Sequence, residues 1–130
     1  METENKKFSV IVVEDDEDTQ RLLQIYLGHH FEVSLCNSAE TFYNTLKEKK
    51  SNVILMDIAL RGSKDGLQLT KELKQSETYR HIPIVAYTAY AYRYDRTEAY
   101  NAGVSYFLTK PVKNKLLYET LITAINNGDK

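Results

Sequence analysis

The sequence predicts an α/β protein in which five strands alternate with five helices to form a doubly wound parallel sheet, a (βα)5 fold. Short runs rich in β-branched and aromatic residues alternate with longer segments whose apolar residues recur at helical spacing. Strict alternation of this kind is typical of parallel strands joined by right-handed helical crossovers, with helices on both faces of the sheet. We therefore expect a single domain over residues 1–130, with its core at about 7–126.

The predicted strands are five short apolar runs. They are FSVIVV (8–13), FEVSLC (31–36), NVILM (52–56), IPIVAY (82–87) and VSYFL (104–108). The first, third and fourth runs are apolar on both faces, as central parallel strands are, whereas the second and fifth interleave polar residues and tolerate an edge. The simple doubly wound order that places the second and fifth strands at the edges is 2-1-3-4-5.

The segments between the strands carry five predicted helical faces. These are Leu22, Leu23, Tyr26 and Leu27, then Ala39, Phe42 and Leu46, then Leu69 and Leu73, then Ala99 and Ala102, and finally Leu117, Leu121, Ala124 and Ile125. Ser38 and Asn114 are expected to cap the second and fifth helices. Gly28 is expected to end the first helix in the left-handed conformation.

The composition argues against two classes of partner. Seventeen Lys and Arg against eighteen Asp and Glu leave a net charge of -1, which provides no long-range attraction for nucleic acid or anionic lipid. No apolar run approaches the roughly 18 residues of a membrane span, and the polar start METENKK lacks the apolar stretch of an export signal. With Cys36 as its single cysteine, the chain is expected in the cytoplasm, without nucleic acid or membrane partners.

Charged and hydroxyl side chains follow four of the five predicted strands. The first strand runs into Glu14-Asp15-Asp16, the third ends on Asp57, the fourth on Thr88 and the fifth on Lys110-Pro111. In a doubly wound sheet, ligands bind beyond the carboxyl ends of the strands, at the point where the strand order reverses. We expect these side chains to meet there.

Carboxylates gathered at one edge repel one another unless a cation compensates their charge. A site of oxygen ligands with no Cys or His nearby favours Mg²⁺, with water and substrate completing its octahedron. A carboxylate can also act as a nucleophile toward phosphorus, and phosphoryl transfer depends on neutralising the charge of the phosphoryl oxygens. The simpler alternative for the acidic triplet alone is helix capping by Asp15 or Asp16 in a solvated turn.

Five motifs together resemble the signature of response-regulator receiver domains. They are VVEDDED (12–18), ILMDIAL (54–60), DGL (65–67), TA (88–89) and LTKP (108–111), and the resemblance covers essentially the whole chain. It implies the flavodoxin-like or CheY-like form of the doubly wound fold. It also implies a stand-alone regulator of a two-component system or phosphorelay, phosphorylated by a histidine kinase or a histidine phosphotransfer protein and not itself an enzyme.

The resemblance also assigns roles to individual residues. Asp57 would be the phosphoacceptor, and Mg²⁺ would be held by Asp15, Asp57, the backbone carbonyl of Ala59 and, through water, Glu14. Thr88 and Lys110 would bind the phosphoryl oxygens. The Lys110-Pro111 peptide bond would be cis. Signalling would reorganise the face made by the fourth helix, the fifth strand and the fifth helix, where a downstream protein would dock.

Three features depart from the family pattern. Arg61 stands where many receivers have proline, and the stretch from Asp57 to Gly66 is one residue longer than usual. The aromatic switch position is Phe107 rather than the common tyrosine, with Tyr106 on the other side of the strand. We expect phosphorylation to draw Thr88 toward Asp57 and to let Phe107 turn inward and gain burial.

Tyrosines gather around the predicted fourth helix. Tyr87, Tyr90, Tyr92, Tyr94 and Tyr100 lie there with Arg93, Asp95 and Arg96. Tyr and Arg are favoured at protein interfaces, so this cluster agrees with a docking face, although some of the rings could instead pack beneath the helix.

Other functions fit the sequence less well. A flavin-binding protein would need glycines and hydroxyls after the first strand, where this chain has Glu14-Asp15-Asp16-Glu17-Asp18. Phosphatases of the haloacid-dehalogenase type carry a second Asp two residues after the nucleophile, where this chain has Ala59. The remaining alternative is a receiver-fold adaptor that binds proteins without being phosphorylated.

Overall fold

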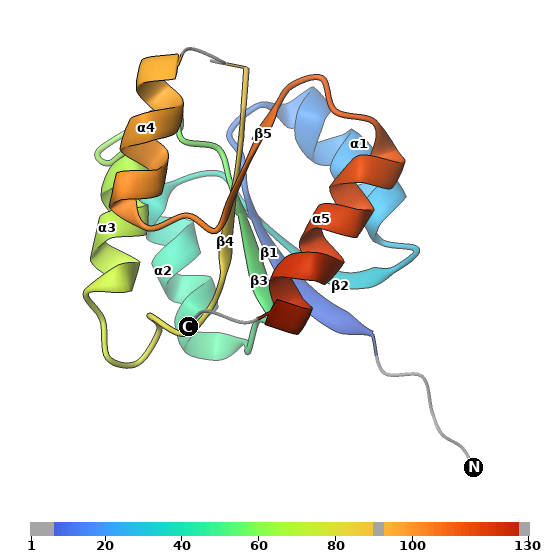
Figure 1. The fold of residues 1–130 in the computed structure, drawn as a ribbon. Helices are drawn as coiled ribbons and strands as arrows, with labels where there is room; N and C mark the ends of the chain where they lie inside the picture. The colour runs from blue at the N-terminus through green and yellow to red at the C-terminus, as the bar shows by residue number, and fades with distance from the viewer. Residues whose placement is uncertain (1–6, 90–92, 128–130) are drawn as a thin grey trace.

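Five parallel strands form one sheet in the order β2-β1-β3-β4-β5 in the computed structural model, which describes residues 7–89 and 93–127 (Figure 1). The strands are β1 (Phe8–Val13), β2 (Phe31–Cys36), β3 (Val53–Met56), β4 (Ile84–Thr88) and β5 (Tyr106–Thr109). The helices are α1 (Glu17–Leu27), α2 (Ala39–Glu48), α3 (Gly66–Lys74), α4 (Arg93–Ala102) and α5 (Asn114–Asn127). The predicted fold class and strand order are confirmed.

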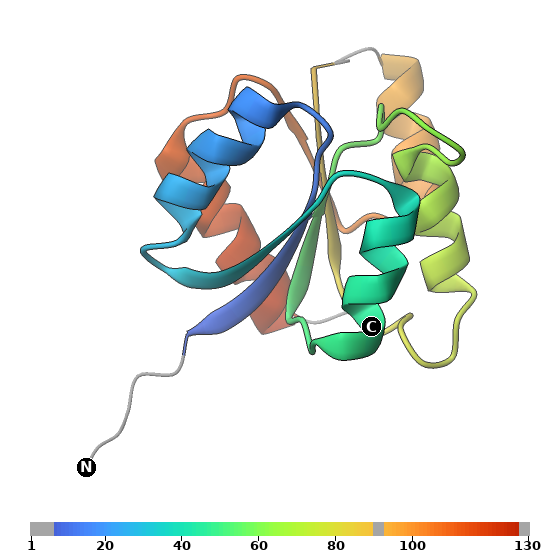
Figure 2. The same cartoon turned by 180° about the vertical axis from the view of Figure 1, so that it is seen from behind.

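Helices cover both faces of the sheet, as Figures 1 and 2 show from opposite sides. Leu23 and Leu27 of α1 and Leu117 and Leu121 of α5 are buried in one cluster with Val10 and other side chains of the strands. On the opposite face, α2, α3 and α4 bury side chains that include Phe42, Leu69 and Ala99 against alternate residues of the same strands. Because side chains alternate along a strand, the central strands supply apolar residues to both clusters.

Side-chain caps fix where the helices begin. Asp16 accepts a hydrogen bond from the Thr19 N–H (2.9 Å) at the start of α1, and Asp65 accepts one from Gln68 (2.9 Å) at the start of α3. Ser38 and Thr41 form a reciprocal capping box on α2, as the sequence predicts for Ser38. These helices begin at the carboxyl edge of the sheet, the upper edge in Figure 1.

Several local expectations are wrong in detail. Leu22 is exposed, because the buried stripe of α1 is Leu23 and Leu27, four residues apart, and Leu22 points about 100° away from it. Gly28 has φ -61°, so it is right-handed, whereas Gly103 after α4 has φ 120°. The helix α5 includes Asn114 as its first residue rather than following it as a cap.

The aromatic cluster around α4 divides. The ring of Tyr87 is buried on the α1 and α5 face, and Tyr100 is exposed. The other predicted members Tyr90, Tyr92, Arg93, Tyr94 and Asp95 lie outside the described side chains.

Gly66 lets the first turn of α3 pass close behind β3. A Cβ at this position would lie 2.2 Å from the Asp57 carbonyl oxygen and 2.5 Å from the Ile58 Cα. We expect Gly66→Ala to lower the free energy of unfolding by about 1–3 kcal/mol, because backbone atoms cannot move aside as a flexible side chain can. Urea denaturation measures this change in the free energy of unfolding.

Lys71→Ala on the exposed face of α3 is the matched control, and it should leave the unfolding midpoint nearly unchanged. Equal midpoints for the two variants would show that the backbone near Asp57 tolerates the extra atom.

Candidate functional site

The register of the central strands brings Glu14 and Asp57 together. Val13 of β1 pairs with Met56 of β3, so the next residue of each strand leaves the sheet at the same level. The Asp57 N–H donates to the Val13 carbonyl oxygen (3.0 Å), which continues the ladder by one more bond. Both side chains are buried, with only 1% of Glu14 and 6% of Asp57 exposed.

Lys110 joins these two carboxylates from the end of β5. Its Nζ lies 2.6 Å from Glu14 Oε1 and 3.2 Å from Asp57 Oδ2. The same ammonium lies 5.1 Å from the centre of the Tyr87 ring. The second oxygen of each carboxylate is also bonded, since Asp16 N–H donates to Glu14 Oε2 (3.0 Å) and Ala59 N–H donates to Asp57 Oδ1 (2.9 Å).

The electrostatics of this trio are set by burial. Desolvation raises the pKa of Glu14, and it outweighs the hydrogen bond from Lys110. Burial alone would lower the pKa of Lys110, but the hydrogen bond to Glu14 and the charge of Asp57 together raise it. One ammonium thus serves two buried carboxylates, and the site keeps an excess of negative charge.

Asp15 is held by the loop that follows β3. Its Oδ2 accepts the Arg61 backbone N–H (2.9 Å) and the Arg61 Nε–H (3.1 Å). Although partial burial works in the opposite direction, these bonds hold the pKa of Asp15 below its usual value. Asp16 points away as the cap of α1, so the capping explanation applies to Asp16 and not to Glu14 or Asp15.

The other predicted site residues lie around this group. Thr88 is buried at the end of β4, where its carbonyl oxygen accepts the Lys110 N–H (2.8 Å). Ala59 contacts Asp57 through its N–H, and the Lys110-Pro111 peptide bond is cis. Thr88 and Phe107 lie on the same sheet face, because Phe107 pairs with Ala86, two residues before Thr88.

Phe107 is already inside the protein. Only 6% of this residue is exposed, and the small side chains of Ala86 and Ala99 belong to the same buried cluster. The expectation that Phe107 gains burial by turning inward is therefore wrong for this arrangement. Tyr106 lies on the other face of the strand as predicted, and its hydroxyl accepts a hydrogen bond from Asn127 (3.0 Å).

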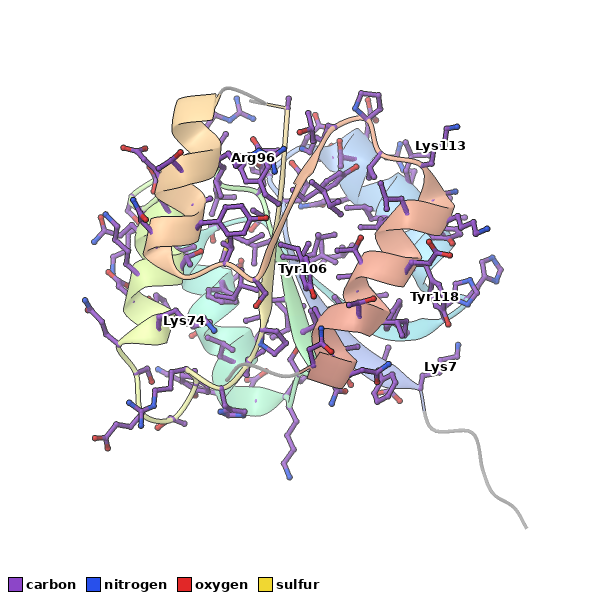
Figure 3. All side chains as sticks on the ribbon, viewed as in Figure 1. Lys7, Lys74, Arg96, Tyr106, Lys113 and Tyr118 are labelled. Atoms are coloured by element: carbon purple, nitrogen blue, oxygen red, sulfur yellow. The ribbon has the colours of Figure 1, made fainter. Side chains whose placement is uncertain are left out.

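Two contacts at the site were not predicted from the sequence. The first is the pairing of Arg61 with Asp15, which joins residues far apart in the chain. The second places the guanidinium of Arg96, on α4, 4.7 Å from the centre of the Phe107 ring, and Figure 3 labels Arg96 on the side of α4 that faces β5. Both arginines are present in the sequence, but the sequence alone does not show which side chains they contact.

The acidic side chains fit a divalent cation. One carboxylate oxygen from each of Glu14, Asp15 and Asp57 lies within 4.8 Å of the others. Two of these carboxylates are almost completely buried and share a single ammonium, so additional positive charge would be stabilising. Oxygen ligands of this kind favour a hard ion such as Mg²⁺.

Comparison with known proteins identifies the family. A family model for the response regulator receiver domain matches residues 10–122. The chain therefore belongs to the receiver-domain family of two-component response regulators.

Individual relatives agree with this assignment. The response regulator PleD of Caulobacter vibrioides is 36% identical over 110 residues, which are 84% of this chain and 24% of PleD. The polar-differentiation response regulator DivK of Brucella ovis is 32% identical over 114 residues, 87% of this chain and 92% of DivK. The chain thus spans about a quarter of the length of PleD and most of the length of DivK.

A solved receiver domain offers a structural comparison. The receiver domain of a sensor histidine kinase from Pseudomonas aeruginosa matches with a TM-score of 0.83 and 29% identity, covering 92% of this chain and 98% of that one. That structure contains a magnesium ion coordinated in its active-site cleft.

Within residues 7–89 and 93–127 of the present chain, no helix has the length and apolar character needed to cross a membrane.

The raised pKa of Glu14 predicts a pH dependence of stability. Because the folded pKa lies above the ordinary value of 4.5, the folded protein holds this proton more tightly than the unfolded chain. The stabilisation that protonated Glu14 gives the folded state is complete below the ordinary pKa of 4.5, and it is lost as the pH rises through the folded pKa. In EDTA, we expect the unfolding free energy of wild type minus that of Glu14→Gln to fall as the pH rises above about 4.5.

Glu119→Gln, on the exposed surface of α5, is the control and should show no such fall. A difference between wild type and Glu14→Gln that stays constant or rises with pH contradicts the explanation by desolvation.

Proposed function

We propose that this chain is a phosphoacceptor that takes a phosphoryl group onto Asp57 from a histidine kinase or a histidine phosphotransfer protein. The observation that carries the proposal is the position of the Asp57 carboxylate, buried at the end of β3 and 3.2 Å from the Lys110 ammonium. A carboxylate in this position can act as a nucleophile, and the ammonium can neutralise the phosphoryl oxygens. Membership of the receiver family supports the same reaction.

The transfer uses the side chains at the strand ends. An oxygen of Asp57 bonds to phosphorus as the bond from phosphorus to the donor imidazole nitrogen breaks, and the imidazole keeps that electron pair. Lys110 shifts from its carboxylate partners toward the phosphoryl oxygens, and the Thr88 hydroxyl donates a hydrogen bond to one of them. The Ala59 N–H, already bonded to Asp57 Oδ1, holds the carboxylate in place.

Mg²⁺ would be held by Asp15, Asp57 and the Ala59 carbonyl, with Glu14 acting through water. When bound, the ion neutralises the negative charge that develops on the phosphoryl oxygens. The proximity of the three carboxylates and the magnesium ion in the related receiver structure support this ligand set.

Phosphorylation would change the surface formed by α4, β5 and α5, where a downstream protein would bind. Thr88 and Phe107 lie on one face of adjacent strands, and the Phe107 ring contacts Arg96 of α4. A movement of Thr88 toward the phosphoryl group would change the packing around Phe107 and, through Arg96, the position of α4. In this route, the contact of the Arg96 guanidinium with the Phe107 ring would take the place of the tyrosine hydroxyl that Phe107 lacks.

The chain would act in the cytoplasm as a signalling protein, not as an enzyme with a separate substrate. The alternative of an adaptor that is never phosphorylated keeps the fold but needs no nucleophile. Burial of two carboxylates beside one ammonium is a costly arrangement that such an adaptor would not require.

We expect Asp57→Ala to abolish phosphorylation by a small phosphodonor with Mg²⁺, while the protein stays folded. The substitution removes the Asp57 carboxylate, which is the nucleophile. This carboxylate is also one of two buried carboxylates that repel each other, so its loss should not reduce stability greatly. Intact mass spectrometry counts the added phosphoryl groups, and circular dichroism checks the fold.

Asp18→Asn, on the exposed surface of α1, is the matched control and should be labelled like wild type. Stoichiometric labelling that persists in Asp57→Ala would place the nucleophile elsewhere, and an unlabelled wild type would favour the adaptor.

We also expect a phosphoryl mimic with Mg²⁺ to shift amide NMR signals of α4 and β5. In the Arg96→Gln variant, the same mimic should cause smaller shifts in α4. A stacked cation contributes about 0.5–1 kcal/mol at an exposed position, enough to change the ratio of two states about two- to fivefold. Lys113→Gln removes an exposed cation just before α5 and is the control. Shifts confined to the loops around Asp57 would rule out this output route.

A further inference from the structure

Arg61 makes an unusual pair of contacts with a proposed metal ligand. Its backbone N–H and its Nε–H both donate to the same oxygen of Asp15, at 2.9 Å and 3.1 Å. The two residues come from different loops, after β3 and after β1, and are separated by 46 positions in the chain. One residue thus provides both a main-chain donor and a cation to a single carboxylate oxygen.

The loop that carries Arg61 turns at a left-handed glycine. Gly62, which follows Arg61, has φ 119°, a left-handed value that disfavours residues with a side chain. A proline at position 61 would have no N–H and no guanidinium, so neither contact could form. The departure of this loop from the family pattern therefore has a direct effect at Asp15.

The Arg61 side chain can move away from Asp15 into solvent. Its side chain is 82% exposed, whereas that of Asp15 is 18% exposed. Release of the guanidinium would cost little, because the Arg61 side chain is already largely in water, where salt screens its attraction to Asp15. A cation in the cluster of Glu14, Asp15 and Asp57 would repel the guanidinium.

We propose that Arg61 is an internal competitor of Mg²⁺ for Asp15 and raises the Mg²⁺ concentration at which Asp57 can be phosphorylated. The inference rests on the metal site proposed above. While the metal is absent, the Arg61 guanidinium stabilises the negative charge of the Asp15 carboxylate. When the metal binds, the guanidinium is displaced. Arg61 is therefore a positioning residue that tunes metal affinity and does not take part in the transfer itself.

The test is a calorimetric Mg²⁺ titration of the full chain carrying Arg61→Gln. Because the Arg61 side chain is largely in water and its ion pair is therefore weak, we expect the variant to bind Mg²⁺ about two- to fivefold more tightly than wild type. Arg21→Gln is the matched control, since Arg21 forms an exposed ion pair with Asp18 (3.4 Å) within α1. That variant loses the same charge and should bind Mg²⁺ with wild-type affinity.

NMR provides a second measurement that needs no phosphorylation. In wild type, the Arg61 Nε–H signal should move toward the position of an unpaired arginine as Mg²⁺ is added. An Arg61 Nε–H signal that stays unchanged at saturating Mg²⁺ would show that the pair coexists with the metal, and it would overturn the competition.

The outcomes separate this inference from the proposed function. Asp15→Ala should remove most Mg²⁺ binding, and binding at wild-type affinity in that variant would overturn the metal site itself and the inference with it. Binding that is lost in Asp15→Ala but equal in wild type and Arg61→Gln would overturn only the role of Arg61. Equal gains in Arg61→Gln and Arg21→Gln would reduce the effect to net charge and also overturn it.

Discussion

The bridge from Lys110 to Glu14 and Asp57 is the interaction on which the rest of the site depends. The sheet register forces two carboxylates to leave adjacent strands at the same level, where burial removes most of their hydration. A single ammonium from the neighbouring strand end compensates part of that charge. The remaining excess is the physical reason why this edge of the sheet suits a divalent cation and a transferable anionic group.

Most of the fold could be predicted from the sequence, because each strand is buried in a way that its composition reveals. The apolar runs of β1, β3 and β4 required central positions, and the polar residues within β2 and β5 allowed the edges. The wrong details were local ones. Leu22 fits the helical spacing as well as Leu23 does, and a glycine such as Gly28 permits the left-handed conformation without requiring it.

The core of the site could also be predicted, since parallel strands bring their carboxyl ends to one edge regardless of loop details. The contacts that Arg61 and Arg96 make could not be predicted. Both depend on contacts between segments distant in sequence, and an exposed arginine has many possible partners. The burial of Phe107 was missed for a similar reason, because the buried cluster that includes its ring is formed by residues of several other elements, among them Ala86 and Ala99.

A crystal structure of the protein grown with Mn²⁺ and a beryllium fluoride mimic of the phosphoryl group tests the central claim most directly. We expect anomalous density for the metal against oxygens of Asp15 and Asp57, with the mimic bonded to Asp57 and contacted by Lys110 Nζ. Metal density outside the cluster of Glu14, Asp15 and Asp57, or the mimic bonded to a different carboxylate, would contradict it.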